Sequence, residues 1–299
     1  MNRYSRRDFL KTTAYTAGTF VLGRYLPNFK YSSEVPLSGH LWLYASKFPP
    51  DWDCTPILEQ VFKDFNAAGL EGIEVMESIL RHDDVVPRVG ALIKKYDLPI
   101  TGSSYYGDMW DASQHSKIIE DVEIVVERLG KLGGSTFGIT VGDAGHIKTE
   151  KELDNQAECL KEVMTICEKN QVQPNMHNHT FEVKNDLHDW KGTVERVPDL
   201  KLGPDLNWLI RGGVDPVWFI KEYGDKMVYL HIRDQDADGN WVKTVGEGVT
   251  DFSAIAKALD EVNFNGRAAI ELAFEEPPTG PVQQYWTESR QYVKEVFGW

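Results

Sequence analysis

Four side chains that could bind one metal ion recur along the second half of the chain. His177, Asp205, His231 and Glu271 each lie at or near the end of a short apolar run, and the gaps between them are 28, 26 and 40 residues. Each gap is about one strand-and-helix unit, so four neighbouring parallel strands could bring them to one point. Two imidazoles and two carboxylates suit Mn²⁺, Co²⁺, Zn²⁺, Fe²⁺ or Ni²⁺ better than Ca²⁺ or Mg²⁺. The pattern predicts one divalent metal ion with open coordination positions for two oxygen atoms of a substrate.

Each of these residues also has a purely structural interpretation. His231 could be a hydrogen-bonded histidine inside the barrel, and Glu271 could be half of a buried ion pair. A buried imidazole or carboxylate without a partner is costly, however, so each needs a compensating group. A shared metal ion would satisfy all four residues together.

The elements that would position these residues alternate regularly after residue 38. Short apolar or β-branched runs are followed by longer stretches with apolar residues three or four positions apart. The candidate strands are Leu41–Ala45, Gly72–Met76, Ile100–Tyr105, Phe137–Val141, Gln173–His177, Leu202–Leu206, Met227–Ile232 and Ala268–Leu272. The candidate helices are Ile57–Ala68, Val86–Tyr96, Ser113–Leu132, Glu150–Lys169, His188–Val197, Asp215–Glu222, Phe252–Val262 and Gln284–Phe297.

Eight such units predict an α/β fold, a closed (β/α)₈ TIM barrel with helices outside and function at the carboxyl ends of the strands. No linker divides the units, so we expect residues 36–299 to form one domain. A doubly wound open sheet is the alternative. It would want a glycine-rich phosphate-binding turn after the first strand, and Leu43–Pro50 contains none.

The N-terminus resembles a twin-arginine export signal, with the motif Ser5-Arg6-Arg7-Asp8-Phe9-Leu10-Lys11. The apolar run that follows, Thr12–Gly23, is too short and too polar for a stable membrane span. We therefore expect residues 1–35 to be an export signal and linker that the twin-arginine machinery recognises, and the folded protein to be periplasmic or otherwise exported. A basic, unstructured N-terminus is the alternative.

Charge and cysteine content exclude several classes of protein. The formal net charge is −14, and because the first thirty residues are basic, the remainder carries −19. Such a surface repels phosphate backbones, so nucleic acid is not an expected partner. Three cysteines are too few for a disulfide framework, and we expect inert thiols. The sequence leaves homo-oligomerisation open.

Five short motifs follow one another in the second half of the chain. They are His177-Asn178-His179-Thr180-Phe181-Glu182, Asp205-Leu206-Asn207-Trp208, Leu230-His231-Ile232-Arg233-Asp234, Gly246-Glu247-Gly248 with Asp251-Phe252, and Ile270-Glu271. In this order they resemble the xylose-isomerase-like TIM-barrel family, over about residues 39–297. That family includes sugar-phosphate isomerases, D-tagatose 3-epimerases and inosose dehydratases. The resemblance implies a (β/α)₈ fold, one divalent metal ion and a hydroxy-ketone or keto-sugar substrate.

The resemblance also implies residue roles. Asp205, His231 and Glu271 match the family's metal ligands on strands six to eight. Glu182 matches a substrate-binding carboxylate, and Arg233 falls where the family has a basic residue near the sugar.

Two positions depart from the family pattern. His177 stands where the epimerases usually have a glutamate that exchanges a proton with substrate, which weakens the case for symmetrical epimerisation. Trp208 stands where a histidine often contacts substrate, so stacking would replace a hydrogen bond there.

The expected chemistry is removal of a proton from a carbon next to a carbonyl, made easier by a metal ion that stabilises the enediolate. Glu271 is the first candidate for the base. His179, Glu182 and His146 are candidates for the partner acid, and His146 is also a candidate substrate contact. Glu74 could hold a substrate hydroxyl, or pair with a base at the barrel mouth.

The fate of the enediolate decides the activity. Reprotonation gives a sugar isomerase or epimerase, which we favour, whereas loss of a β-substituent gives a lyase acting on an inosose or a 3-keto-glycoside. A non-catalytic sugar-binding protein is a third hypothesis. An endonuclease on the same barrel would need more histidines and a basic face, and the chain has eight histidines and an acidic surface.

Overall fold

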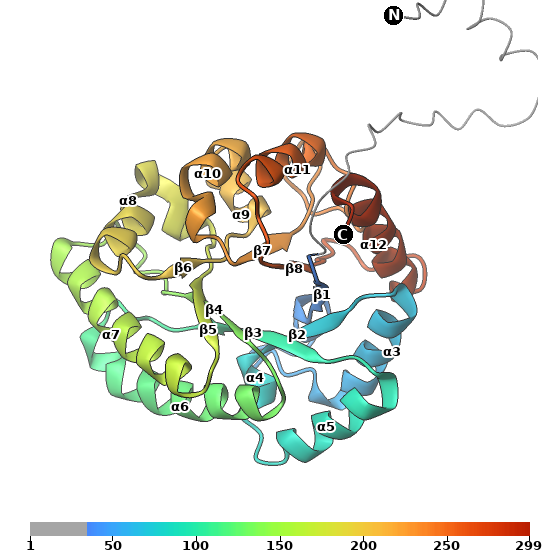
Figure 1. Cartoon of the computed structure of the whole chain (residues 1–299), viewed down its shortest axis with the longest axis horizontal. Helices are drawn as coiled ribbons and strands as arrows, with labels where there is room; N and C mark the ends of the chain where they lie inside the picture. The colour runs from blue at the N-terminus through green and yellow to red at the C-terminus, as the bar shows by residue number, and fades with distance from the viewer. Residues whose placement is uncertain (1–34) are drawn as a thin grey trace, which may run out of the picture.

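The chain forms a barrel of eight parallel strands, which Figure 1 shows along its axis. The computed structural model describes residues 35–299. The strand order β6-β5-β4-β3-β2-β1-β8-β7 keeps consecutive strands adjacent, which confirms the predicted barrel and excludes the doubly wound sheet. The strands are β1 (Leu37–His40), β2 (Gly72–Met76), β3 (Ile100–Tyr106), β4 (Thr136–Thr140), β5 (Gln173–Met176), β6 (Lys201–Leu202), β7 (Tyr229–Ile232) and β8 (Arg267–Ile270).

The two ends of this sheet meet through isolated parallel bridges. Leu202 bridges to Met227, and Asp205 bridges to His231. The backbone N–H of His231 donates to the carbonyl oxygen of Pro204 at 2.9 Å. Closure of the barrel therefore places two of the predicted metal ligands side by side.

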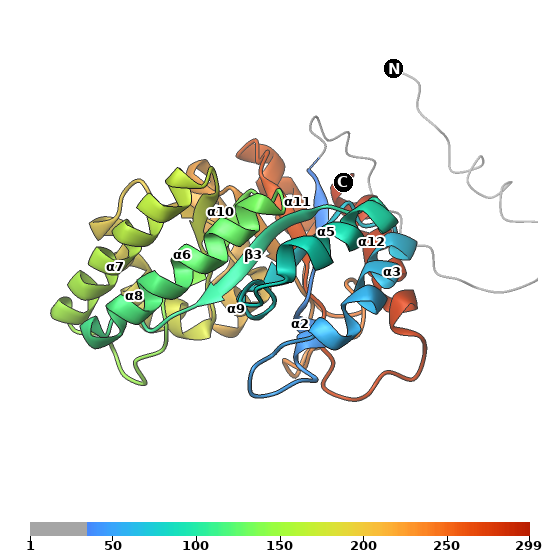
Figure 2. The same cartoon turned by 90° about the horizontal axis from the view of Figure 1, so that it is seen from below.

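Helices cover the outside of the barrel (Figure 1). Three short helices, α2, α4 and α9, directly follow β1, β2 and β6, at the carboxyl ends of the strands; Figure 2 shows α2 at the lower end of the molecule. The helices are α2 (Trp42–Ala45), α3 (Leu58–Ala68), α4 (Glu77–Leu80), α5 (Val85–Tyr96), α6 (His115–Lys131), α7 (Glu150–Lys169), α8 (Thr180–Arg196), α9 (Leu206–Arg211), α10 (Pro216–Tyr223), α11 (Phe252–Glu261) and α12 (Val282–Phe297).

The outer helices pack on the strands through apolar stripes. On α6, Ile118, Val122, Val125 and Leu129 are buried at the three- and four-residue spacing that the sequence shows. Burying a side chain of this kind contributes about 1.5–3 kcal/mol. The capping box at Thr149 fixes the start of α7 at the predicted residue.

The first strand lies four residues before its predicted position. The apolar run Leu41–Ala45 forms the α2 turn, in which the N–H of Ala45 donates to the Leu41 carbonyl oxygen. The true strand contains Ser38 and Gly39, which are not typical of strands. Glycine is required at position 39 because a Cβ would lie 2.6 Å from the Phe65 ring. Because α3 packs closely on β1, this strand contains a glycine and lacks the apolar run by which the other strands are predicted.

One predicted helix is longer than expected. The His188–Val197 prediction covers only the second part of α8, which begins at Thr180 and is interrupted by non-helical residues at Lys184–Leu187. The predicted export signal and linker at residues 1–35 lie, apart from residue 35, outside the described residues. Within residues 35–299, no helix is long and apolar enough to cross a bilayer.

Candidate active site

A cavity of about 210 Å³ lies at the carboxyl ends of the strands. The residues that line it include His40, His177, His231 and Glu271, which lie at the carboxyl ends of β1, β5, β7 and β8. Aromatic side chains form much of the remaining wall. This is the face of a TIM barrel on which catalytic residues are found.

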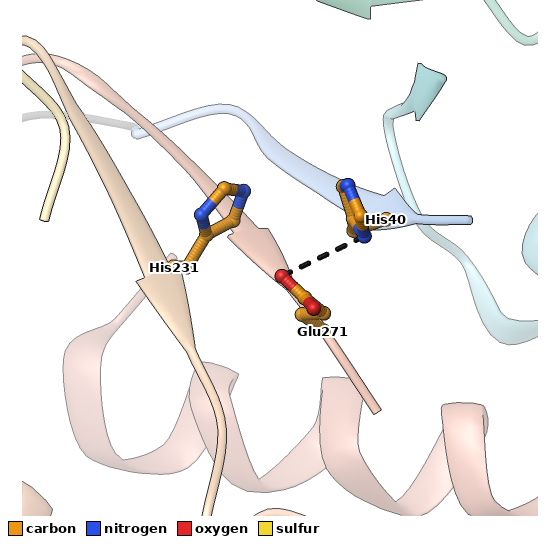
Figure 3. A group of neighbouring side chains, drawn as sticks. All are labelled: His40, His231 and Glu271. Carbon is orange, nitrogen blue, oxygen red and sulfur yellow. Dashed lines mark ion pairs between the residues drawn. The ribbon is translucent and has the colours of Figure 1, made fainter. Parts of the chain in front are cut away.

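The four predicted metal ligands are buried there, but in two overlapping groups. His177, Asp205 and His231 offer ligand atoms within 4.8 Å of one another. Glu271 belongs to a second group within the same distance limit, with His40 and His231, which Figure 3 shows. His231 is common to both groups. The predicted quartet therefore separates into a His-Asp-His group and a neighbouring carboxylate.

His231 is held by hydrogen bonds at both ring nitrogens. Its Nε2 lies 2.6 Å from Glu74, and its Nδ1 lies 2.9 Å from Nδ1 of His177. Burial opposes a charge on His231, but Glu74, Glu271 and Asp205 together raise the pKa of His231 to about 9. In the metal-free protein, His231 is thus a cation that donates to both partners.

The structure revises the role of Glu74. Its carboxylate is buried, accepts from Tyr229 as well as from His231, and is absent from the cavity wall. It is therefore not placed to hold a substrate hydroxyl, as the sequence had suggested. A carboxylate on the outer nitrogen of a metal-binding histidine fixes the ring and its tautomer. Glu74 is placed to do this for His231.

Two atoms beside His231 have lone pairs available for a cation. Burial, and then the charge of His231, hold the pKa of His177 well below its ordinary value, so its ring is neutral. Asp205 uses Oδ1 to accept the backbone N–H groups of Asn207 and Trp208 at the start of α9. Its Oδ2 is buried without a hydrogen-bond partner, 3.6 Å from the Arg233 guanidinium.

These donors fit a divalent transition metal. Two imidazole nitrogens and one carboxylate oxygen form a ligand set that such ions favour. Two nitrogens that each lie about 2.1 Å from one ion are separated by about 3 Å when they meet at a right angle. The observed 2.9 Å between the two Nδ1 atoms matches this. The orphaned Asp205 oxygen supplies the third donor.

Glu271 lies beside this group and is paired with Arg233. The guanidinium of Arg233 donates to Oε1 of Glu271, and His40 Nδ1 lies 3.6 Å from Oε2. Burial would raise the pKa of Glu271, but Arg233, and then His40 and His231, lower it to about 2. Glu271 is therefore ionised, with a carboxylate oxygen exposed to the cavity.

The sequence did not identify His40 as a site residue. His40 is the last residue of β1, but the sequence pattern predicts this strand four residues later, at Leu41–Ala45. The His40 Nδ1 accepts the backbone N–H of Trp42 at 3.1 Å, and its Nε2 lies 3.0 Å from the Ser104 hydroxyl. Burial lowers the pKa of His40. A search for polar residues just before the apolar run would have found it.

His179 and Glu182 have different roles in the structure. His179 lines the cavity, with its Nδ1 3.3 Å from the Thr140 hydroxyl, and burial lowers the pKa of His179 to about 4. Glu182 is fully buried and is absent from the cavity wall. Its carboxylate accepts the backbone N–H groups of His179 and Val141. Glu182 therefore positions His179 and cannot touch a substrate in this cavity.

His146 lies outside the cavity. Its half-exposed ring pairs with Glu152 at 3.0 Å and lines a separate pocket with residues of α8. The buried Lys148 anchors the loop after β4 to Asp189 of α8 at 2.6 Å. The structure does not support the proposed substrate contact of His146.

Trp208 and Arg233 both line the cavity, as the sequence predicts. The Arg233 guanidinium lies over the rings of Trp208 and Trp241, 5.5 and 4.9 Å from their centroids. Arg233 is buried, yet its Nε and Nη1 have no hydrogen-bond partner. Both donors are buried, and leaving buried donors unpaired is costly.

The family comparison matches this geometry. A sequence model of the xylose isomerase-like TIM barrel matches residues 62–296, which is most of the chain. The chain belongs to this family. The chain is 21% identical to the inosose dehydratase of Klebsiella pneumoniae (strain 342), over 83% of this chain and 93% of that protein. It is also 21% identical to the inosose dehydratase of Clostridium perfringens (strain 13 / Type A), over 89% and 98%.

Solved structures show the same fold. A sugar phosphate isomerase/epimerase from Parabacteroides distasonis ATCC 8503 superposes with a TM-score of 0.71 at 15% identity, covering 89% of this chain and 96% of that one. A D-allulose 3-epimerase from Methylomonas sp. in complex with D-allulose gives 0.69 at 15% identity, with coverage of 89% and 98%. The 3-keto-D-glucoside 4-epimerase from E. coli gives 0.68 at 17% identity, with coverage of 87% and 99%.

Proposed function

We propose that this protein is a divalent-metal-dependent sugar isomerase or epimerase that removes and returns a proton next to a carbonyl group. One observation carries the proposal. Two imidazole nitrogens 2.9 Å apart and an orphaned carboxylate oxygen belong to three residues whose ligand atoms lie within 4.8 Å of one another, and a second, ionised carboxylate lies beside them.

His177, Asp205 and His231 would hold the ion, and Glu271 stands next to them. When bound, the ion would supply positive charge at the carbonyl oxygen of the sugar, which makes the neighbouring C–H more acidic. Glu271 is the proposed base, because its carboxylate is ionised and reaches the cavity.

Arg233 controls the strength of that base. While it pairs with Glu271, the carboxylate is a weak proton acceptor, because its pKa is about 2. The Nε and Nη1 donors of Arg233 have no hydrogen-bond partner, and a rotation of the side chain into the cavity would offer them to substrate oxygens. Turning toward the substrate would free Glu271 and raise its basicity.

His179 is the proposed partner across the cavity. It follows β5, which lies opposite β1 in the eight-strand order, whereas Glu271 follows β8, next to β1. A neutral imidazole can donate or accept a hydrogen bond at the substrate oxygen as charge develops there. Glu182 fixes the position of the His179 backbone.

Elimination is the second candidate reaction. Within residues 35–299, the carboxylates that line the cavity are Glu77 and Glu271. Glu77 follows β2 and Glu271 follows β8, so no carboxylate faces Glu271 from the β5 side. A base on one face without a matching carboxylate on the other favours loss of a β-substituent over inversion. Similarity to the inosose dehydratases also supports this reaction.

Solvent deuterium distinguishes the two reactions. Metal-loaded protein is incubated in D₂O with D-fructose, D-allulose, an inosose and methyl 3-keto-β-D-glucoside, and the products are analysed by NMR and mass spectrometry. Deuterium at carbon in an intact or isomerised sugar supports the proposal. Loss of water or methanol supports elimination. Protein that binds no metal ion, or catalyses neither reaction on any of these substrates, would refute the proposed function.

A matched pair of variants tests the base. Glu271→Gln is expected to lower turnover by at least about a thousandfold, whereas Glu276→Gln, on the exposed segment that follows, is expected to keep wild-type activity. Full activity in Glu271→Gln would overturn the assignment.

We also propose that the protein acts outside the cytoplasm, where glycosides are met before uptake. The proposal rests on the N-terminal motif with Arg6 and Arg7. Fractionation of the native host, with an Arg6→Lys/Arg7→Lys variant as control, tests it. Cytoplasmic retention of the wild-type protein would contradict it.

A further inference from the structure

One side of the cavity, formed by the segment after β1 and by the ends of β2 and β3, is apolar and mostly aromatic, and the proposed chemistry does not need it. Trp42, Trp52, Met76 and Tyr106, here called the Trp52 wall, line this side. The rings of Trp42 and Trp52 contact each other, with centroids 5.5 Å apart. Trp52 and Tyr106 remain 37% and 44% exposed, so the wall extends from the enclosed cavity to its rim.

The part of the Trp52 wall beside β2 stands across the barrel from Trp208, which also lines the cavity. The Ser78 hydroxyl, just after β2, donates to the Trp52 carbonyl oxygen at 3.0 Å and holds the Trp52 loop there. Trp208 follows β6, which is four strands from β2 in an eight-stranded barrel. A ligand whose sugar ring lies against Arg233 and Glu271 would therefore extend toward Trp52.

The size of the enclosed space sets how much of the ligand is covered. Pockets that enclose drug-sized ligands have volumes of roughly 300–1,000 Å³. The cavity here is about 210 Å³, which suits one sugar ring. A second ring would lie on the exposed rings of the Trp52 wall.

Trp52 is kept in an unfavourable backbone conformation. Its φ is +52°, in the left-handed region that bulky side chains rarely adopt. Strained conformations of this kind cluster at functional sites. Trp218 on α10 is similarly exposed, at 43%, but has helical backbone and lies outside this cavity.

A carboxyl group lies at the foot of the Trp52 wall. This is Glu77, which lies between Met76 and Ser78 in the sequence and lines the cavity. Burial raises the pKa of Glu77, and Arg81, 3.9 Å away, offsets this only in part. A carboxyl group can form hydrogen bonds with a bound ligand in either protonation state.

We propose that the Trp52 wall and Glu77 form a subsite for a second ring, so that the substrate is a glycoside and not a free monosaccharide. This inference rests on the proposed function for the position of the reacting sugar. The second ring, a sugar or an aromatic group, stacks on Trp52, and Glu77 forms a hydrogen bond with the ligand near the junction of the two rings.

The test compares ligands that differ only in the second ring. Metal-loaded wild-type protein is titrated by calorimetry with methyl β-D-glucoside, methyl β-cellobioside and phenyl β-D-glucoside, which have no carbonyl group and cannot react. We expect at least one of the two-ring ligands to bind at least tenfold tighter than methyl β-D-glucoside. The better ligand identifies the second ring as a sugar or an aromatic group. Equal affinities within twofold would overturn the subsite.

Variants test which residues cause the preference for a two-ring ligand over methyl β-D-glucoside. Trp52→Ala is expected to reduce it at least fivefold and Trp52→Phe to keep most of it, whereas Trp218→Ala, the matched control, leaves it unchanged. Glu77→Gln can still form a hydrogen bond and should keep the preference, and Glu77→Ala should lower it. The same preference in Trp52→Ala, with an unchanged melting temperature, would refute the stacking role. An unchanged preference in Glu77→Ala would refute the role of Glu77.

The subsite and the proposed function fail separately. Wild-type deuterium exchange into D-allulose without any two-ring preference would remove the subsite and leave the proposed function. A two-ring preference without exchange or elimination on any sugar would leave the subsite and remove the proposed function.

Discussion

Replacing Arg233 tests whether its guanidinium, in the absence of a metal ion, neutralises the two carboxylates at the proposed metal site, Asp205 and Glu271. Arg233 is buried and contacts Glu271 and Asp205, so Arg233→Met leaves two buried carboxylates without this partner. Removing one partner of a buried ion pair costs about 3–5 kcal/mol. For a domain of this size, that lowers the melting temperature by about 6–20 °C.

A divalent cation should reverse this loss, because it can neutralise the same carboxylates. Thermal unfolding is followed by circular dichroism in EDTA and in saturating Mn²⁺. We expect Mn²⁺ to raise the melting temperature of Arg233→Met by more than that of the wild type. The control is Arg196→Met, whose ion pairs with Glu150 and Asp154 are near the surface and contribute at most about 1 kcal/mol.

Two results would refute this reasoning. Wild-type stability of Arg233→Met in EDTA would show that the buried carboxylates do not depend on the guanidinium. An equal effect of Mn²⁺ on both proteins would show that Arg233 and the metal ion do not share partners.

Three further predictions concern the metal site and the thiols. Glu74→Gln should weaken Mn²⁺ binding about 10- to 100-fold in calorimetry, since it removes the carboxylate that orients His231; unchanged affinity would exclude that role. Because the folded-state pKa of His231 is raised to about 9, its contribution to metal-free stability is full below about pH 6.5 and is lost as pH rises through 9. Mn²⁺ affinity should rise over the same range, since binding displaces a proton, and a flat profile would contradict this. Burial raises the pKa of Cys54, Cys159 and Cys167 to about 12, so the native protein should not react with a thiol reagent at pH 8, and rapid labelling would show otherwise.

Local periodicity was enough to predict most of the barrel. Seven strands lie within a few residues of their predicted positions, because buried parallel strands carry apolar runs that can be recognised without knowing their neighbours. The exception is β1, in which Gly39 is required by the Phe65 ring of α3. That requirement comes from a residue 26 positions away, so no local pattern signals it.

The candidate site was predicted only in part, for a related reason. His177, Asp205 and His231 lie at the carboxyl ends of three consecutive strands, β5 to β7, and strand order alone brings them together. Whether a side chain then points into the cavity depends on its neighbours. Glu182 matches a family motif but turns to the backbone N–H groups of His179 and Val141.

The sequence by itself determined the fold class, the family and the end of the barrel at which polar residues gather, because these follow from periodicity and from the order of motifs along the chain. The tertiary structure decided that His40 joins the site, that Glu74 supports His231 from behind, and that Arg233 pairs with Glu271. These relations join side chains 38 to 231 residues apart. They depend on distances across the barrel and on burial, which no local pattern specifies.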